Sequence, residues 1–171
     1  MPQFILNINS ASDTVYRDEN ICCYLLNESL PDGYVQSFSA EGRLVLLGGK
    51  NAAERCKLLN ADGVVADISS DYPIKAQVAK VAEKLGKGKV LGVVVCARRH
   101  EAMLASETEP QFVAFRFAPE EKDKAQELIA WYNELFLIQC AVDLRGGLQN
   151  LDGIDADFVI INSHDYKDFG C

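Results

Sequence analysis

Short polar segments follow several unbroken apolar runs of this chain, and they hold the residue types that bind ions or transfer protons. If the apolar runs are parallel strands, their carboxyl ends meet at one edge of a sheet or one mouth of a barrel, so these segments would share one site. The candidate residues are Gly48, Gly49, Lys50, Asn51, Asp67, Ser69, Ser70, Asp71, Cys96, Arg98, Arg99, His100, Asp143, Arg145, Gly146, Gly147, Asn162, Ser163, His164 and Asp165.

Two of these segments predict a phosphate site. Gly146 and Gly147 follow one late run, and Asn162 and Ser163 close the next. Backbone amides at this place in a barrel often bind phosphate. The alternative is that the two glycines only make a tight turn where a helix has shrunk. We expect phosphate or another small ligand to be bound by Lys50, Asn51, Arg98, Arg145, Gly146, Gly147, Asn162 and Ser163.

Asp67 and Asp71 are the candidate metal ligands. Mg2+ is commonly held by one or two carboxylates together with water and substrate phosphate. Asp71, which stands before a Tyr-Pro pair, could instead be a turn or cap residue. Mg2+ is therefore the one cofactor that the residues suggest, and no cofactor is assigned with certainty.

Each of the other chemically active residues has a structural interpretation as well as a functional one. The segment "ARRH" at 97–100 could clamp an anion, or it could be the solvated start of a helix. Cys96 could be an activated thiolate, although a buried structural cysteine is favoured. His164 could act as an acid or base but lies near the end of the chain and is expected to be exposed. No catalytic residue is assigned.

Eight apolar runs would position these residues. From residue 42 onward all of them are nearly continuous rather than alternating, which is typical of parallel strands covered on both faces. They are residues 3–9, 20–27, 42–49, 62–68, 89–97, 111–118, 137–144 and 157–163. Helical stretches are predicted at 50–59, 74–86, 98–106 and 119–136. The last of these places Ala125, Leu128, Ile129, Tyr132 and Leu135 on one face.

The pattern predicts an α/β protein with one domain over 1–171, a degenerate (β/α)8 barrel of the TIM type. The connections 10–19 and 28–41 look like loops, and 145–154 is too short for much helix, so helices 1, 2, 7 and 8 should be reduced or missing. An open doubly wound sheet is the alternative. The phrases "NADGVVADIS", "TEPQFVAFRF" and "IDADFVIINS" recur on alternate strands, which favours the barrel.

Composition excludes several classes of protein. The net charge of -8 repels nucleic acid, and the basic residues are scattered. No apolar run approaches the ~20 residues that cross a membrane, and the first residues lack the features of a signal peptide. We therefore expect a cytoplasmic protein that contacts no membrane. Its six cysteines include no C-x-x-C pair, which suits reduced thiols better than disulfides or zinc.

Part of the chain resembles a known family. "LLNADGVVADISSDYP" (58–73) is similar to the fourth strand of the thiamine phosphate synthases and their TenI-like relatives. "RRHEAMLASETEPQFVAF" (98–115) and "ELIAWYNELFLIQCAV" (127–142) resemble the fifth helix through the seventh strand. The resemblance covers about 42–163. It implies a (β/α)8 barrel that uses Mg2+ to condense a pyrimidine diphosphate with a thiazole phosphate and releases pyrophosphate.

The chain departs from that family at most of its functional positions. The Gln-x-Arg-x-Lys cluster that reads the diphosphate is replaced by "LLNESLP" (25–31). Where the family has metal ligands, this chain offers Lys50 and Asn51, then Asp67 or Asp71. The Lys-containing loop after the sixth strand is missing, whereas the Gly-Gly of the thiazole phosphate site corresponds to Gly146 and Gly147.

These departures lead to three expectations about function. The first is a divergent synthase-like barrel without synthase activity, which binds a small phosphorylated or heterocyclic ligand at the mouth. The alternative is a structural or interaction protein with a vestigial site, and an active synthase comes third.

A homodimer is expected through the first two strands, because their apolar outer faces would lack covering helices. The expected anchors are Phe4, Ile21, Tyr24, Tyr34 and Phe38.

Overall fold

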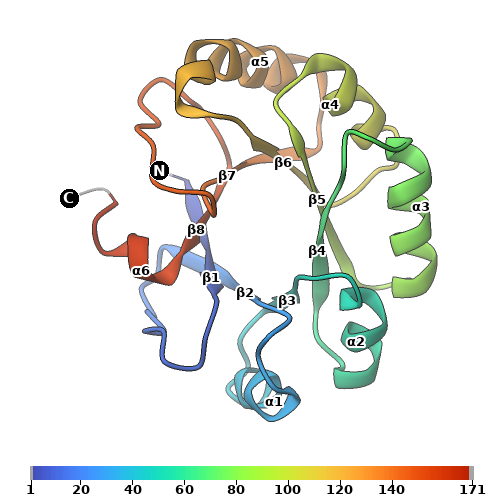
Figure 1. Cartoon of the computed structure of the whole chain (residues 1–171), viewed down its shortest axis with the longest axis vertical. Helices are drawn as coiled ribbons and strands as arrows, with labels where there is room; N and C mark the ends of the chain where they lie inside the picture. The colour runs from blue at the N-terminus through green and yellow to red at the C-terminus, as the bar shows by residue number, and fades with distance from the viewer. Residues whose placement is uncertain (1, 170–171) are drawn as a thin grey trace.

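Eight parallel strands close into a single barrel in the computed structural model, which describes residues 2–169 (Figure 1). Each strand pairs with its neighbours in chain order, and β8 returns to pair with β1. The strands are β1 Gln3–Ile8, β2 Ile21–Leu26, β3 Val45–Leu47, β4 Gly63–Asp67, β5 Val90–Cys96, β6 Phe112–Arg116, β7 Gln139–Asp143 and β8 Phe158–Asn162. The predicted barrel is confirmed, and the recurring phrases fall on β4, β6 and β8.

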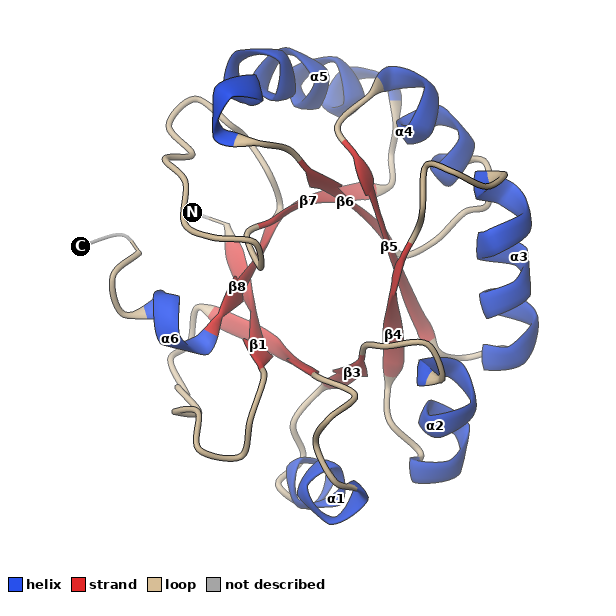
Figure 2. Cartoon of the chain, viewed as in Figure 1, coloured by secondary structure: helices blue, strands red, loops and turns tan. Residues whose placement is uncertain are grey.

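Helices surround the barrel on its outer face, as Figure 2 shows. They are α1 Asp32–Ala40, α2 Ala52–Leu59, α3 Ile74–Leu85, α4 Arg99–Ser106, α5 Lys122–Leu135 and α6 Ser163–Tyr166, with a short 3-10 turn, η1 Pro119–Glu121, before α5. All four predicted helical stretches are confirmed. On α5 the predicted buried face holds except at Leu135, which ends the helix and is 63% exposed.

The reduction of helices is confirmed except in the second connection. Among the described residues no helix lies between β1 and β2 or between β7 and β8, and β8 is followed by a single turn, α6. The expected loop at 28–41 is wrong, because its centre forms the nine-residue α1. Pro31 directly precedes this helix, where a proline costs no hydrogen bond, and Val35 and Phe38 are buried by it.

The first two strands are covered by the chain's own connections. The ring of Phe4 packs edge-on against Tyr166 at 5.3 Å and Phe169 at 5.6 Å, and Tyr24 lies 5.3 Å from Phe38 on α1. Phe4, Tyr24 and Phe38 are therefore buried, and Ile21 and Tyr34 are half-buried. The bare apolar patch expected over these strands does not exist. A homodimer stays a prediction, but its structural argument was wrong.

The side chains inside the barrel form a separate apolar cluster that fills its lower part. Its buried members are Ile5, Cys23, Leu25, Leu46, Val65, Val94, Phe112, Ala114, Ala141 and Ile160. This packing closes the barrel below its mouth, so a ligand can enter only from the C-terminal ends of the strands. No helix among residues 2–169 is long and apolar enough to span a bilayer.

Gly92 should be essential to this interior packing. A β-carbon at residue 92 would overlap the ring of Phe112 on the adjacent strand. We expect Gly92→Ala to destabilise the fold by about 1–3 kcal/mol through overpacking, measured by urea unfolding. Gly33→Ala on α1 is the control, because a β-carbon there has no heavy atom within 4 Å. It should leave stability unchanged or raise it by up to about 1 kcal/mol. Equal stability of the two variants would contradict this packing.

Candidate functional site

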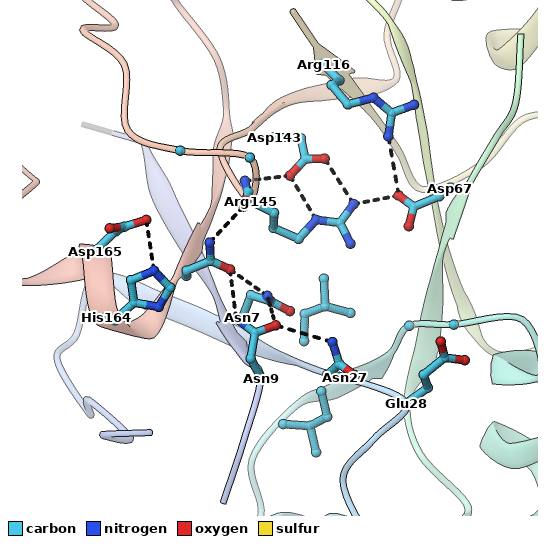
Figure 3. A pocket seen from close by; sticks show the side chains of 17 residues that line it. Asn7, Asn9, Asn27, Glu28, Asp67, Arg116, Asp143, Arg145, His164 and Asp165 are labelled. Atoms are coloured by element: carbon cyan, nitrogen blue, oxygen red, sulfur yellow. Dashed lines mark hydrogen bonds and ion pairs between the residues drawn. The ribbon is translucent and has the colours of Figure 1, made fainter. Parts of the chain in front are cut away.

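A polar cavity of about 770 Å³ opens at the C-terminal ends of the strands (Figure 3). It is lined by Asn7, Asn9, Leu25, Leu26, Asn27, Glu28, Gly48, Gly49, Asp67, Arg116, Asp143, Arg145, Gly146, Gly147, Asn162, His164 and Asp165. These residues come from the ends of strands all around the barrel. Closure of the sheet therefore assembles the site from segments that are far apart in the sequence.

The structure brings together several of the predicted ligand residues and leaves others outside. Arg145, Gly146, Gly147 and Asn162 line the cavity, as does Asp67. Lys50, Asn51, Arg98, Ser163 and Asp71 do not line it.

The predicted residues outside the cavity are held by local contacts. Ser163 is buried and its hydroxyl donates to the carbonyl of Thr14. Lys50 and Asn51 lie just before α2, and the Lys50 backbone amide donates to Glu28 at 3.2 Å. Asp71 is exposed, and its backbone amide donates to the Ser69 hydroxyl.

Arg98 lies beside the cavity, in a smaller hollow of about 200 Å³. It shares this hollow with Cys96, Arg116 and Lys124, and its guanidinium lies 3.3 Å from the carboxylate of Glu101. Cys96 is half-buried, with its sulfur 3.6 Å from the Ser70 hydroxyl. The segment "ARRH" thus begins α4 and does not converge on the central cavity.

Arg145 crosses the mouth of the barrel and binds two carboxylates. Its Nε donates to Asp143 at 2.9 Å, and its Nη2 donates to Asp143 at 3.0 Å and to Asp67 at 2.6 Å. Burial alone would lower the pKa of Arg145, but the hydrogen bonds and charges of Asp143 and Asp67 raise it. Arg145 is consequently always charged, and its positive charge is neutralised within the protein.

Four asparagines form a second network at the same mouth. Asn7 and Asn9 both donate to the side-chain oxygen of Asn162, at 2.8 and 3.1 Å. Asn27 donates to Asn9 at 3.3 Å, and Asn162 donates to the carbonyl of Arg145 at 2.8 Å. The asparagines at and just beyond the ends of β1, β2 and β8 are thereby joined to the arginine network.

Sequence reasoning missed Asn7, Asn9, Asn27, Glu28 and Arg116. Each stands at or just beyond the end of an apolar run, as in "ILNIN" and "LLNE", and that position was the available signal. Four of the five lie before residue 42, where the chain resembles no family motif. Their position in the cavity lining depends on the closed barrel, in which β1 and β2 bring their C-terminal ends to the mouth.

The cavity carries more negative than positive charge. Its carboxylates are Glu28, Asp67, Asp143 and Asp165, and its guanidinium groups are Arg116 and Arg145. The imidazole of His164 lies 3.6 Å from Asp165 and is largely exposed. Since like charges repel across such a site, the lining disfavours an anionic ligand and favours a neutral or cationic one.

Of the two predicted metal ligands, Asp67 lines the cavity and Asp71 does not, so Mg2+ binding by this pair stays a prediction. Asp67 lines the cavity but is paired with Arg145, and Arg116 lies 3.9 Å from it. Asp71 is outside the cavity. No group of three or more His, Cys, Asp or Glu residues within 2–169 is arranged to hold a metal ion.

The fold and the cavity define a small (β/α)8 barrel with a polar site at its C-terminal mouth. No protein-family model matches the chain. Over 119 residues it is 34% identical to a thiamine-phosphate synthase of Erythrobacter litoralis (strain HTCC2594), a match that covers 62% of this chain and 53% of that protein. The chain thus matches about half the length of this relative.

Solved structures agree on the fold. The thiamine phosphate pyrophosphorylase of Pyrococcus furiosus superposes with a TM-score of 0.61 at 12% identity, covering 94% of this chain and 85% of that one. The tryptophan synthase complex of the same organism gives a TM-score of 0.68 at 13% identity, covering 95% and 88%. The sequence resemblance to the thiamine phosphate synthases is confirmed over this part of the chain, and the solved structures confirm the barrel fold.

Removal of the Arg145 side chain should lower the free energy of unfolding, because the buried carboxylate of Asp143 would lose its compensating charge. The side chain of Asp143 is 4% exposed, so Arg145→Met leaves it without its ion-pair partner. We expect a loss of about 3 kcal/mol in the free energy of unfolding. The double variant Arg145→Met with Asp143→Asn should regain much of the lost free energy of unfolding, because it no longer buries an uncompensated charge.

Arg116→Met is the matched control for this experiment. Arg116 is 45% exposed and lies 3.9 Å from Asp67, so its removal should cost less than about 1 kcal/mol. Similar losses for the two arginine variants would show that the network at Arg145 does not stabilise the mouth.

Proposed function

We propose that this protein is a synthase-like barrel without synthase activity, which binds a small polar heterocycle lacking phosphate in the cavity at its mouth. The observation that carries the proposal is the composition of the lining. The lining contains both an asparagine network and four carboxylates. The charge of Arg145 is neutralised by Asp67 and Asp143.

The absence of synthase activity follows from the charge at the position that should read the diphosphate. The family resemblance places a basic cluster after the second strand, where this chain has Asn27 and Glu28. Both line the cavity. Expulsion of pyrophosphate depends on positive groups that stabilise the leaving charge, and a carboxylate there acts in the opposite direction.

The asparagine network suits a ring with nitrogen and amino groups. Each asparagine side chain offers a carbonyl acceptor and two N–H donors. Asn9 donates one N–H to Asn162 and accepts from Asn7 and Asn27. Asn27 donates one N–H to Asn9 and accepts from the Ser29 amide, so each of the two side chains retains a second N–H donor for a ligand. Leu25 and Leu26 contribute apolar surface to the same cavity. Apolar walls with a few directed polar groups are typical of sites for small heterocycles.

A phosphorylated ligand is the less favoured of the two expected ligands. Over Gly146 and Gly147 it would meet Arg145, whose guanidinium is bound to Asp143 and Asp67. Asn162 is hydrogen-bonded to Arg145, and Ser163 donates to Thr14. Three of the groups that were expected to hold the phosphate, Arg145, Asn162 and Ser163, are thus engaged within the protein.

Ligand binding is tested by titrating the aminopyrimidine and thiazole alcohols of thiamine, each beside its phosphate ester, in a thermal-shift or calorimetric assay. We expect saturable binding of at least one alcohol and weaker binding of its ester. If none of these ligands binds at millimolar concentration, the proposal is contradicted and the alternative of a structural or interaction protein is favoured.

Glu28→Gln tests the electrostatic argument separately. The variant removes a negative charge from the cavity, so it should strengthen binding of the phosphate ester several-fold and leave binding of the alcohol nearly unchanged. Glu19→Gln is the control, because Glu19 is exposed and does not line the cavity. An equal effect of both variants would mean that net charge, not the cavity, sets the preference.

Synthase activity is tested by incubating the purified protein with the pyrimidine diphosphate, the thiazole phosphate and Mg2+. We expect no thiamine phosphate above the background without protein, measured by fluorescence after oxidation. Product formed with turnover would refute the absence of synthase activity.

A further inference from the structure

Two adjacent cysteines lie at the opposite end of the barrel from the cavity. Cys22 and Cys23 are the second and third residues of β2, near the strand's amino end. They take no part in the site at the mouth. Their geometry differs from that of ordinary neighbours in a strand.

An irregularity in strand pairing brings the two thiols to the same side. On β1, Phe4 pairs with Ile21 and Ile5 pairs with Cys23, so Cys22 is an extra residue without a partner. Successive side chains of a regular strand point to opposite faces, and a bulge breaks this alternation. The two sulfur atoms consequently lie 3.9 Å apart. The Cys22 thiol also donates to the carbonyl of Phe4 at 3.4 Å.

One thiol of the pair is accessible, and the other is held in place by packing. Cys22 is exposed, whereas Cys23 is 4% exposed and belongs to the apolar cluster inside the barrel with Ile5 and Leu25. A reagent from solution can therefore react with the Cys22 thiol first. The Cys23 thiol is then close enough to react second.

The hydrogen bond between the two thiols makes them chemically unequal. It lowers the pKa of Cys22, which favours the reactive thiolate at the exposed position. It raises the pKa of Cys23, and burial acts there in the same direction. Such a pair presents one nucleophile with a protonated neighbour beside it.

The other cysteines within 2–169 stand apart from one another. The thiol of Cys56 donates to the Ala61 carbonyl, and that of Cys140 to Asn133. Cys96 lies next to the hydroxyl of Ser70. Two-point attachment to a small thiophilic group is thus a property of the pair in β2.

We propose that Cys22 and Cys23 form a chelating dithiol site for trivalent arsenic. With phenylarsine oxide, two S–H bonds break and two As–S bonds form, while the oxygen leaves as water. Arsenic stays trivalent and both sulfurs keep their oxidation state, so no oxidant or reductant is needed. Rotation of the exposed Cys22 side chain about χ1 adjusts the sulfur separation.

Chelation by neighbouring residues has a diagnostic consequence. Once the first As–S bond has formed, the second thiol acts at a high effective concentration, so the ring resists displacement by a monothiol. A competing dithiol forms a ring of its own and removes the arsenic. An adduct on a single cysteine is removed by both reagents.

The test treats the reduced, purified chain with one equivalent of phenylarsine oxide, followed by excess 2-mercaptoethanol or excess dithiothreitol. Intact mass should show one phenylarsenic group retained in 2-mercaptoethanol, with loss of two titratable thiols, and complete removal by dithiothreitol. No adduct in 2-mercaptoethanol would overturn the proposal.

Matched variants assign the site. Cys22→Ser changes an exposed side chain and should abolish the retained adduct without altering thermal stability, so a folding defect cannot explain the loss. Cys96→Ser and Cys171→Ser should react like the native chain; the second removes a thiol outside the described residues. Retention of the adduct by Cys22→Ser, or its loss in either control, would place the chemistry elsewhere.

Discussion

The position of Arg145 is the constraint on which the mouth of the barrel depends. Its guanidinium joins Asp143 at the end of β7 to Asp67 at the end of β4, on the other side of the opening (Figure 3). Asp143 is buried, so a charged partner is needed to compensate its carboxylate. The carbonyl of Arg145 also accepts the amide of Asn162, which links the ion pairs to the asparagines of β1 and β2.

This constraint supports the ligand that we propose for the cavity. The guanidinium of Arg145 is hydrogen-bonded to Asp67 and Asp143, so the carboxylates offset its attraction for a phosphate. Glu28 then adds negative charge at the position where the resemblance to the thiamine phosphate synthases implies a basic cluster. The mouth of this barrel thus offers amide groups and carboxylates.

Much of the fold could be predicted from the sequence, because buried parallel strands are written as continuous apolar runs. Helix α1 was missed because its Gly, Ser and Pro neighbours are typical of loops, and it is held by burial of Val35 and Phe38. At the mouth, Asp67, Arg145 and Asn162 could be found as strand-end residues. Their partners could not, since Arg145 and Asp67 are 78 residues apart in the chain and Asn7 and Asn162 are 155 apart.

We infer that the asparagine network, and not the glycine turn, receives the ligand. Titration of the uniformly nitrogen-15-labelled protein, followed through side-chain and backbone amide resonances, tests this most directly. We expect an unphosphorylated pyrimidine or thiazole alcohol to shift the side-chain amides of Asn9 and Asn27, and inorganic phosphate to leave them unshifted. Shifts of the Gly146 and Gly147 backbone amides by phosphate, with the asparagine signals unmoved, would contradict it.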